Sequence, residues 1–314
     1  MNFVPLHIRT GYSFLKSSIR IEKLFEKAKN LGYEALGLCD LSNFYALPKF
    51  DKCAKSNKFG SIYGTEIKIE SNILSFYALN EEGYRNINKI ISLSSKKSLD
   101  YKEITFEDIK EYNSGIALVI STDNEIFNAV NEKLKEYIKN LKNLYPIIYI
   151  GIEIYDFKDK AHIDLIRDFA LSNNINTFAF PKIYYLNKEE AISLDILKAI
   201  EENTQLFDNL KPTFTEYYLK SEEEYNTYYT KEEILNTKKF LLSSDFVFNK
   251  PRGELIHYLS GNEKETSDYF IKLINEGAKK RDIDVTNPIY KNRLNKEYVT
   301  IKKLGYIFIS RFFT

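Results

Sequence analysis

The chain of 314 residues contains only two cysteines, a single methionine and no tryptophan. Cys39 and Cys53 are too few, and too unpatterned, for a disulfide framework or a zinc site. We interpret both as free thiols in a reducing cytoplasm. An excess of charge of either sign is also missing, because 45 basic and 44 acidic residues give a net charge of +1. No overall field therefore draws the chain to nucleic acid or anionic lipid, and any DNA contact would need a local patch.

Signals for secretion and membrane insertion are absent as well. The most apolar segment, residues 144–155, is too short to span a bilayer and contains Glu153. The N-terminus lacks the basic and then apolar arrangement of a signal peptide. The sequence has no GxxxxGKS/T, GxGxxG, HExxH, CxxC or GxSxG motif, so common nucleotide-binding, metalloprotease and hydrolase sites are not indicated. We expect a cytoplasmic protein with no membrane partner.

What the sequence does contain is a regular alternation of strand-like and helix-like stretches. Residues 21–31 place apolar side chains on one helical face, and Gly32 ends that pattern. Repeated units of this length predict a parallel sheet or barrel with outer helices, and chemistry gathers at the C-terminal ends of such strands. The expected strands are residues 3–9, 35–39, 61–69, 73–79, 115–121, 147–154 and 176–180, and the expected helices are residues 21–31, 45–56, 81–93, 124–144, 161–173 and 188–200.

The pattern changes after about Asn203. Ser221 and Glu224 have the spacing of a capping box, which predicts a helix start after a short strand at residues 217–220. The glycines and the proline of residues 249–261 indicate a linker. Three further helices are expected, at residues 231–242, 265–281 and 290–304.

Seven segments at these predicted strand ends and helices have a common order and spacing. They are FVPLHIRTGYSFL from Phe3, ALGLCDLSN from Ala35, IYGTEI from Ile62, NEEGYRNI from Asn80, YLNKEEAISLDILKAI from Tyr185, YLKS from Tyr218 with Asn236 and Thr237, and YKNRLNKEYVTIKKLG from Tyr290. Together they resemble the N-terminal PHP-domain portion of bacterial DNA polymerase III alpha subunits, over nearly the whole chain.

This resemblance implies an α/β fold, a distorted seven-stranded PHP barrel over residues 1–250. Residues 251–314 would be a linker and the start of the polymerase palm. The family is a DNA-directed DNA polymerase, a nucleotidyltransferase of chromosomal replication that uses Mg²⁺. Its palm carboxylates lie beyond the RLNKEY helix, and the chain ends nine residues after Gly305. We therefore expect a fragment that cannot polymerise DNA by itself and that contacts DNA only through the missing domains.

Active PHP domains hold several divalent metals, and the resemblance carries each ligand position onto this sequence. Two positions keep ligand character, His7 and Glu66. Asp40 also remains, next to a position where the family has histidine. The other positions are occupied by Arg9, Lys16, Leu41, Ile73, Lys182 and Tyr184, and the region near Thr122 offers no cysteine. Two ligands cannot neutralise a multinuclear cluster, so we expect no metal and no PHP hydrolysis in this chain.

The cationic substitutions suggest a hypothesis of their own. Arg9, Lys16 and Lys182 would converge on the cavity where metals sit in active members, facing Glu66 and Asp40, so that ion pairs replace the metals. In the alternative, the lysine side chains point to solvent. A single histidine at a strand end, such as His7, is more often hydrogen-bonded than metal-ligating.

Three functions are compatible with these features. The first is an inactive PHP scaffold within polymerase III, with a docking surface for the proofreading exonuclease subunit. The second is a stand-alone PHP metal-dependent phosphoesterase, which the substitutions at Leu41, Ile73 and Lys182 and the trailing helix oppose. The third is a non-catalytic binding module that functions without a polymerase.

Overall fold

The computed structural model describes residues 2–205, 211–249, 263–304 and 306–307. It divides into two units, Met1–Phe248 and Asn249–Thr314, each of which is described by itself. Apart from Asn249, the predicted linker lies outside the described residues. The identity of the second unit as the start of a palm stays a prediction.

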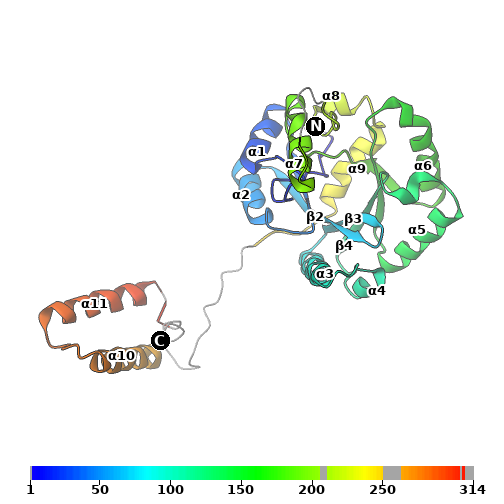
Figure 1. The fold of residues 1–314 in the computed structure, drawn as a ribbon. Coiled ribbons are helices and arrows are strands. Elements are labelled where there is room, and N and C mark those ends of the chain that lie inside the picture. The colour runs from blue at the N-terminus through cyan, green and yellow to red at the C-terminus, as the bar shows by residue number, and fades with distance from the viewer. Residues whose placement is uncertain (1, 206–210, 250–262, 305, 308–314) are drawn as a thin grey trace. The chain divides into compact units, whose positions relative to one another are not determined.

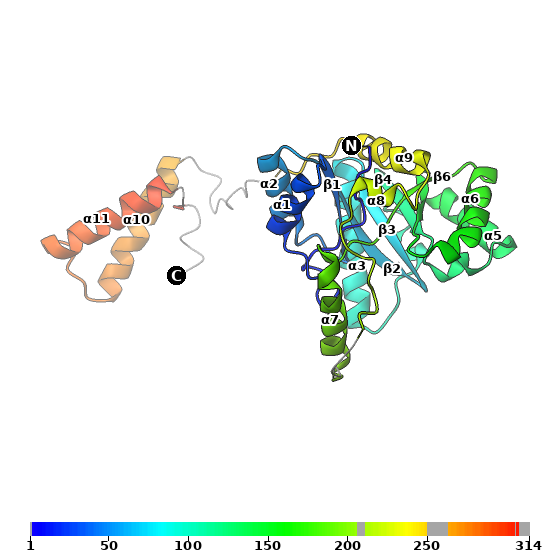
Figure 2. The ribbon, with the colours of Figure 1, turned by 90° about the horizontal axis from the view of Figure 1, so that it is seen from above.

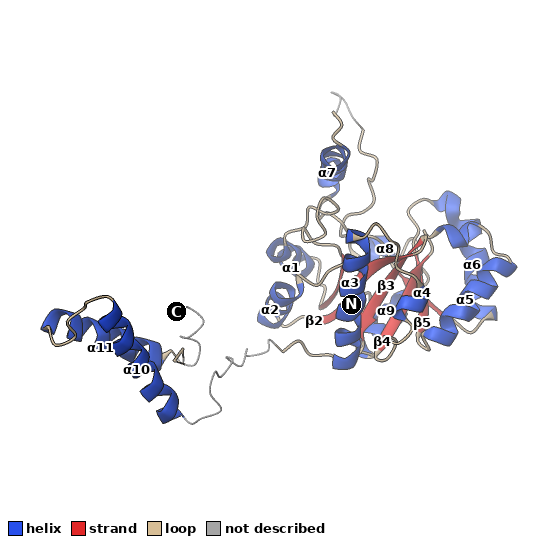
Figure 3. Ribbon diagram, turned by 60° about the horizontal axis from the view of Figure 1, so that its bottom comes forward, coloured by secondary structure: helices blue, strands red, loops and turns tan. Residues whose placement is uncertain are grey.

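The first unit is built around one six-stranded sheet with the strands in chain order (Figure 3). The strands are β1 (Ala35–Leu41), β2 (Gly60–Ile69), β3 (Asn72–Ala78), β4 (Ile116–Ser121), β5 (Ile148–Ile152) and β6 (Asn176–Ala179). Three neighbouring pairs are parallel, but β3 runs antiparallel to both β2 and β4. The predicted parallel sheet is therefore interrupted at β3, because only Glu70 and Ser71 join it to β2 and so short a connection gives a hairpin.

Residues 3–9 were predicted to form the first strand. In the structure they form isolated bridges and no full strand, and they lie between the two edges of the sheet. Ile8 makes isolated parallel bridges to Leu38 on β1 and to Ile183, beyond the end of β6. The Cys39 N–H donates to the Ile8 carbonyl at 2.8 Å, and the Arg9 N–H donates to Ile183 at 3.1 Å. The N-terminal segment thus joins the two edges of the sheet. The predicted α/β fold is confirmed, as a curled half-barrel with six strands among the described residues where a seven-stranded barrel was expected.

The helices within residues 21–172 lie around the outside of this sheet (Figures 1 and 2). Their apolar faces meet the outward side chains of the strands, as the 3.6-residue periodicity predicts. The predicted helix at residues 124–144 is interrupted, because Asn131 caps a new helix by accepting from the Lys133 and Leu134 N–H groups. The helices are α1 (Ile21–Asn30), α2 (Leu47–Asn57), α3 (Glu81–Leu99), α4 (Phe106–Ile109), α5 (Glu132–Leu144), α6 (Lys160–Ser172), α7 (Ile192–Glu202), α8 (Glu222–Tyr225) and α9 (Lys231–Leu242), with short 3-10 turns at Glu125–Asn128, Phe157–Asp159 and Lys188–Ala191.

The inside of the half-barrel is filled with aromatic side chains. Phe240 of α9 packs with its ring centroid 5.1 Å from those of Tyr77 and Phe178 and 4.9 Å from that of Tyr149. Asn236 on the same helix donates to the Thr177 carbonyl of β6 at 2.9 Å. This apolar interior cluster leaves the opposite, C-terminal end of the strands for polar groups.

The capping box predicted at the start of α8 is present. The Glu224 N–H donates to the Ser221 hydroxyl at 3.2 Å, and the Ser221 N–H donates to the Glu224 carboxylate at 2.9 Å. The second unit contains α10 (Glu263–Lys280) and α11 (Pro288–Lys303), with Phe270 and Tyr298 stacked at 6.2 Å. Across the described ranges, no helix has both the length and the apolar character needed to cross a bilayer.

A substitution at Gly37 on β1 tests whether the N-terminal segment packs against that strand. A Cβ atom at this position would lie 2.7 Å from the Leu6 carbonyl oxygen, which is backbone and cannot rotate away. We expect Gly37→Ala to lower the free energy of unfolding by about 3 kcal/mol, as measured by urea denaturation. Gly11→Ala is the control, because its nearest contact is an ordinary 3.4 Å. Equal stability of the two variants would contradict the packing of residues 5–8 against β1.

Candidate functional site

Inward-facing side chains at the C-terminal ends of the strands form a polar layer above the aromatic interior. Because side chains alternate along a strand, Glu66 of β2, Ser121 of β4 and Glu153 after β5 all point inward. Ile73 joins them because β3 is antiparallel and begins at this end. The layer borders a cavity of about 390 Å³ that is lined by Arg9, Leu15, Lys16, Glu66, Ile73, Asp123, Lys182, Tyr184, Leu194, Lys198, Glu201, Glu202, Phe214 and Tyr217.

Arg9, Glu66 and His7 form the first half of a buried ionic cluster. Arg9 Nε donates to Glu66 Oε2 at 2.6 Å, and His7 Nε2 lies 3.0 Å from Glu66 Oε1. His7 is fully buried, with its ring stacked on Phe180 at 4.3 Å between centroids. Its other ring nitrogen, Nδ1, lies 3.6 Å from Glu153 Oε1, so the imidazole stands between two carboxylates.

Glu153, Lys182 and Asp123 form the second half. Lys182 Nζ pairs with Asp123 and lies 3.2 Å from Glu153 Oε2. Glu153 is buried and also accepts from the Ser121 hydroxyl and, at 3.0 Å, from the Tyr155 hydroxyl. The same Tyr155 oxygen accepts from the Lys182 N–H at 2.7 Å, which fixes the backbone next to the ammonium group.

The electrostatics follow from this pairing. Burial disfavours the ionised form of Glu66, but Arg9 and His7 outweigh burial and hold the pKa of Glu66 well below its usual range. Burial also lowers the pKa of Lys182, yet Glu153 and Asp123 more than compensate and keep it well above the usual lysine pKa. For Glu153 burial dominates, and its pKa is raised despite Lys182. The cations Arg9 and Lys182 therefore keep their charge in the buried layer.

Not all predicted pocket residues meet there. Lys16 lines the cavity at its exposed rim, where its Nζ lies 2.5 and 2.7 Å from the two carboxylate oxygens of Glu201 on α7. Asp40 was expected to face the cations, but its carboxylate accepts instead from the Thr10 N–H, the Thr10 hydroxyl and the Ser13 hydroxyl. Leu41, at the end of β1, is half-buried and is not among the residues that line the cavity.

One group of described residues has the geometry to bind a single metal ion. Ligand atoms of His7, Cys39 and Glu66 lie within 4.8 Å of one another, and all three residues are buried. However, Glu66 is already held by the Arg9 guanidinium, and burial raises the pKa of the Cys39 thiol well above its usual value. The Arg9 charge next to a metal ion and the protonated Cys39 thiol both oppose metal binding at these three residues. The three ligands are also too few for a multinuclear cluster.

Glu153, Asp123 and Cys39 are the functional-site residues that sequence reasoning missed. Glu153 could have been identified from the sequence. It lies in the most apolar segment of the chain, and a carboxylate that is buried there needs hydrogen-bond or ion-pair partners. Asp123 lies two residues after the end of β4, in the region where parallel sheets place their chemistry. Nothing in the sequence brings Cys39 next to His7, because that proximity depends on the Ile8 bridge to β1.

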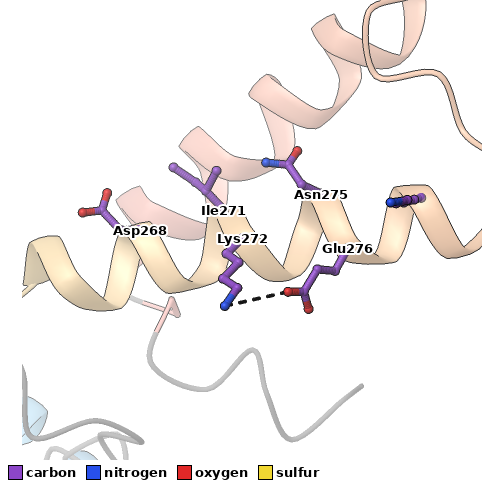
Figure 4. Close-up of a pocket in the computed structure, with 6 residues that line it drawn as sticks. Asp268, Ile271, Lys272, Asn275 and Glu276 are labelled. Carbon is purple, nitrogen blue, oxygen red and sulfur yellow. Dashed lines mark ion pairs between the residues drawn. The ribbon is translucent and has the colours of Figure 1, made fainter.

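Other features carry less chemistry. His162 Nε2 lies 2.8 Å from the Phe127 carbonyl, as expected for a structural histidine, and His257 is outside the described residues. In the second unit, a shallow hollow on the surface of α10 is flanked by Asp268, Ile271 and Asn275, with Lys272 and Glu276 paired at 3.9 Å (Figure 4). These are the ordinary side chains of an exposed helix face.

The family model for the PHP domain matches residues 5–156. A DNA polymerase III subunit alpha from Buchnera aphidicola is 27% identical over 97% of this chain, and one from Halalkalibacterium halodurans is 26% identical over 98%. One from Treponema pallidum is 24% identical over 98% of the chain. The chain spans 28% of the length of the first two relatives and 29% of the third.

Solved structures with related folds share far less sequence. An amidohydrolase from Chromobacterium violaceum is 10% identical, with a TM-score of 0.44 over 59% of this chain and 88% of its own. A two-domain protein from Bacteroides vulgatus with a predicted PHP-like phosphoesterase domain is 10% identical, with a TM-score of 0.41 over 75% of this chain and 62% of its own.

Asp40 gives this site a pH dependence that can be measured. Burial raises the pKa of Asp40 to about 6, although Ser13 and Thr10 donate hydrogen bonds to the ionised form. Between pH 4 and 6 the folded state therefore binds more protons than the unfolded state, and stability falls as pH rises, by about 3 kcal/mol in total. Asp40→Asn keeps an acceptor without the charge, so its free energy of unfolding should lack this fall. Parallel stability curves for the two proteins from pH 4 to pH 7, by urea denaturation, would contradict the assignment.

Proposed function

Because this chain contains a PHP domain and is similar along nearly its whole length to the N-terminal part of DNA polymerase III alpha subunits, we propose that it is the PHP scaffold of such a subunit, held together by ion pairs in place of metals. The observation that carries this proposal is the position of Lys182 Nζ, which pairs with both Asp123 and Glu153. Two converging carboxylates that bind an ammonium group are no longer free to bind a divalent cation.

Arg9 supports the same proposal from the other side of the cavity. Its guanidinium lies on Glu66, one of the two positions that keep ligand character. A metal ion at Glu66 would have to displace Arg9 or stand next to its charge, and both cost free energy in a buried layer. The domain therefore keeps its barrel and has no hydrolytic function.

The role of such a domain is then structural and cytoplasmic. It would support the adjoining polymerase domains, which supply the Mg²⁺-dependent nucleotidyl transfer and the contacts with DNA in chromosomal replication. It would also present a surface on which the proofreading exonuclease subunit docks. These functions belong to the whole subunit, of which the chain spans the N-terminal part.

The alternative, a metal-dependent phosphoesterase, rests on the proximity of His7, Cys39 and Glu66. It requires stoichiometric metal in the purified wild-type protein. Metal analysis by mass spectrometry, after dialysis against Zn²⁺ or Mn²⁺ and then metal-free buffer, separates the two functions. We expect less than about 0.1 metal ion per chain, in accordance with the small number of free ligands. One ion or more per chain would overturn the proposal.

Lys182→Met tests whether the ammonium group replaces a metal. The variant leaves Glu153 and Asp123 without their cation, and we expect a loss of about 3 kcal/mol in the free energy of unfolding. Mn²⁺ at millimolar concentration should restore part of this loss in the variant and leave the wild type unchanged. Lys16→Met is the matched control, because it breaks an exposed pair with Glu201 and should cost less than about 1 kcal/mol. A Lys182→Met variant as stable as the control would contradict the structural role of the ion pair.

The docking role has its own test. The full chain and the purified proofreading exonuclease subunit of the same organism should elute as a one-to-one complex in size-exclusion chromatography with light scattering. The reason is that a scaffold beside the palm would bring proofreading close to the growing strand. An unrelated nuclease of similar size serves as the control. Separate elution of the two proteins at micromolar concentrations would favour the non-catalytic module that works without a polymerase.

A further inference from the structure

The helical hairpin of the second unit has an apolar groove of about 330 Å³ along one side. Over the described length of α11, Pro288–Lys303, no residue is buried. The side chains that meet at the groove are therefore not enclosed by the two helices alone. Five half-buried apolar side chains line it, namely Phe270, Leu273, Ile274, Ile283 and Leu294.

Two helices of this length are too small to complete a core by themselves. Helices in proteins are held mainly by the packing of their apolar faces, and a hairpin offers only one line of contact. Units of this size need a disulfide, a metal ion or a further packed element. Both cysteines of the chain, Cys39 and Cys53, lie in the first unit, so a disulfide is excluded. The open groove therefore indicates a third element that packs on the hairpin.

The chain turns inward directly after α11. The Tyr306 N–H donates to the Ile301 carbonyl at 3.0 Å, which is the hydrogen bond of a Schellman motif and ends the helix with a turn. Tyr306 is 49% exposed, but Ile307 is only 5% exposed. The segment that follows α11 therefore begins packed against the protein and not in solvent.

The next seven residues, 308–314, have the sequence FISRFFT and lie outside the described ranges. Their large apolar residues are Phe308, Ile309, Phe312 and Phe313. At 100° per residue, a helix would place these four side chains on one face and the serine, arginine and threonine on the other. This is the pattern of a segment that binds in an apolar groove through one face.

The segment is also long enough to reach the groove. Phe270 of α10 stacks on Tyr298 of α11, with 6.2 Å between the ring centroids. Lys303, the last residue of α11, is five residues beyond Tyr298, so the helix ends about 8 Å along its axis from this contact. Seven residues span about 10 Å as a helix and about 23 Å when extended. Residues 308–314 can therefore run back along α10 past Phe270 toward Leu273.

We propose that residues 308–314 bind in the groove between α10 and α11 of the same chain and form the third element of the second unit. A segment tethered this closely has an effective concentration in the millimolar range at the groove, above that of any separate chain. The same chain is therefore a better source of the occupant than a second copy or another protein. The inference concerns the second unit and does not depend on the ion pairs of the first.

The chain contains no tryptophan, so Phe312→Trp places a single fluorescent reporter in the segment. We expect its quenching by acrylamide to be several-fold weaker than that of a Tyr101→Trp reporter, because Tyr101 is 99% exposed and a side chain in the groove is shielded from the quencher. Light scattering should show a monomer at low and at high micromolar concentration. Equal quenching of the two reporters would overturn the proposal. Protection that appears only together with dimers would also overturn it, in favour of a second copy.

Two substitutions on α10 test whether the groove is the place of protection. Leu273 lines the groove, whereas Ile271 is 41% exposed and lines the shallow hollow on another side of the helix. Added to Phe312→Trp, Leu273→Asp should raise the quenching of the reporter to the level of the Tyr101→Trp protein, because a buried carboxylate opposes packing of the apolar segment. Ile271→Asp is the matched control and should leave the reporter protected. The same quenching in both variants would contradict the assignment of the groove.

A second pair of variants lies within the segment and leaves α10 and α11 unchanged, in case Leu273→Asp unfolds the hairpin. In the Phe312→Trp protein, Ile309→Asp puts a charge on the apolar side of the segment and should release the reporter. Ser310→Asp puts the same charge on the polar side and should leave the reporter protected. Circular dichroism verifies that both variants keep the helices. Release of the reporter by both substitutions, or by neither, would overturn the proposal.

Discussion

The pairing of buried charges at the open end of the half-barrel is the constraint on which the rest of the site depends. Arg9 and Lys182 are held by Glu66 and Glu153, and His7 stands between the two glutamates. None of these groups could be buried alone, since an unpaired charge in such a layer costs several kcal/mol. The pairs also link segments far apart in sequence, because Arg9 follows the first bridge to β1 and Lys182 follows β6. The charges therefore tie the two edges of the sheet together where the backbone makes only isolated bridges.

The aromatic interior explains why these charges lie at one end of the half-barrel. Phe240 of α9 fills the opposite end and contacts Tyr77, Tyr149 and Phe178. Inward positions along the strands thus change from aromatic to charged within a few residues, as at Tyr149 within β5 and Glu153 directly after it. At the polar end, the Arg9 guanidinium carbon lies 4.5 Å from the centroid of the Tyr184 ring.

Local signals in the sequence predicted local structure well. The Ser221 and Glu224 capping box, the helix that ends before Gly32 and most strand positions are all present, because each depends on neighbours within a few residues. The prediction failed where the outcome depends on distant partners. Asp40 was expected to face the cations, yet the turn at residues 10–13 offers it three donors at hydrogen-bonding distance. Glu153 was read only as a charge in an apolar segment, because its partners Ser121 and Lys182 are far away in sequence and meet it only in the closed sheet.

Lys182 shows how one ammonium group stabilises two buried carboxylates. Two carboxylates at the end of β4 and after β5 would repel each other if both were ionised and unpaired. Here one ammonium group lies between Asp123 and Glu153. The ammonium donates hydrogen bonds but offers no open coordination position, so it can stabilise the carboxylates without activating water. Under the proposed function, a change from a ligand to a lysine would therefore remove the chemistry and supply the charge that keeps the layer folded.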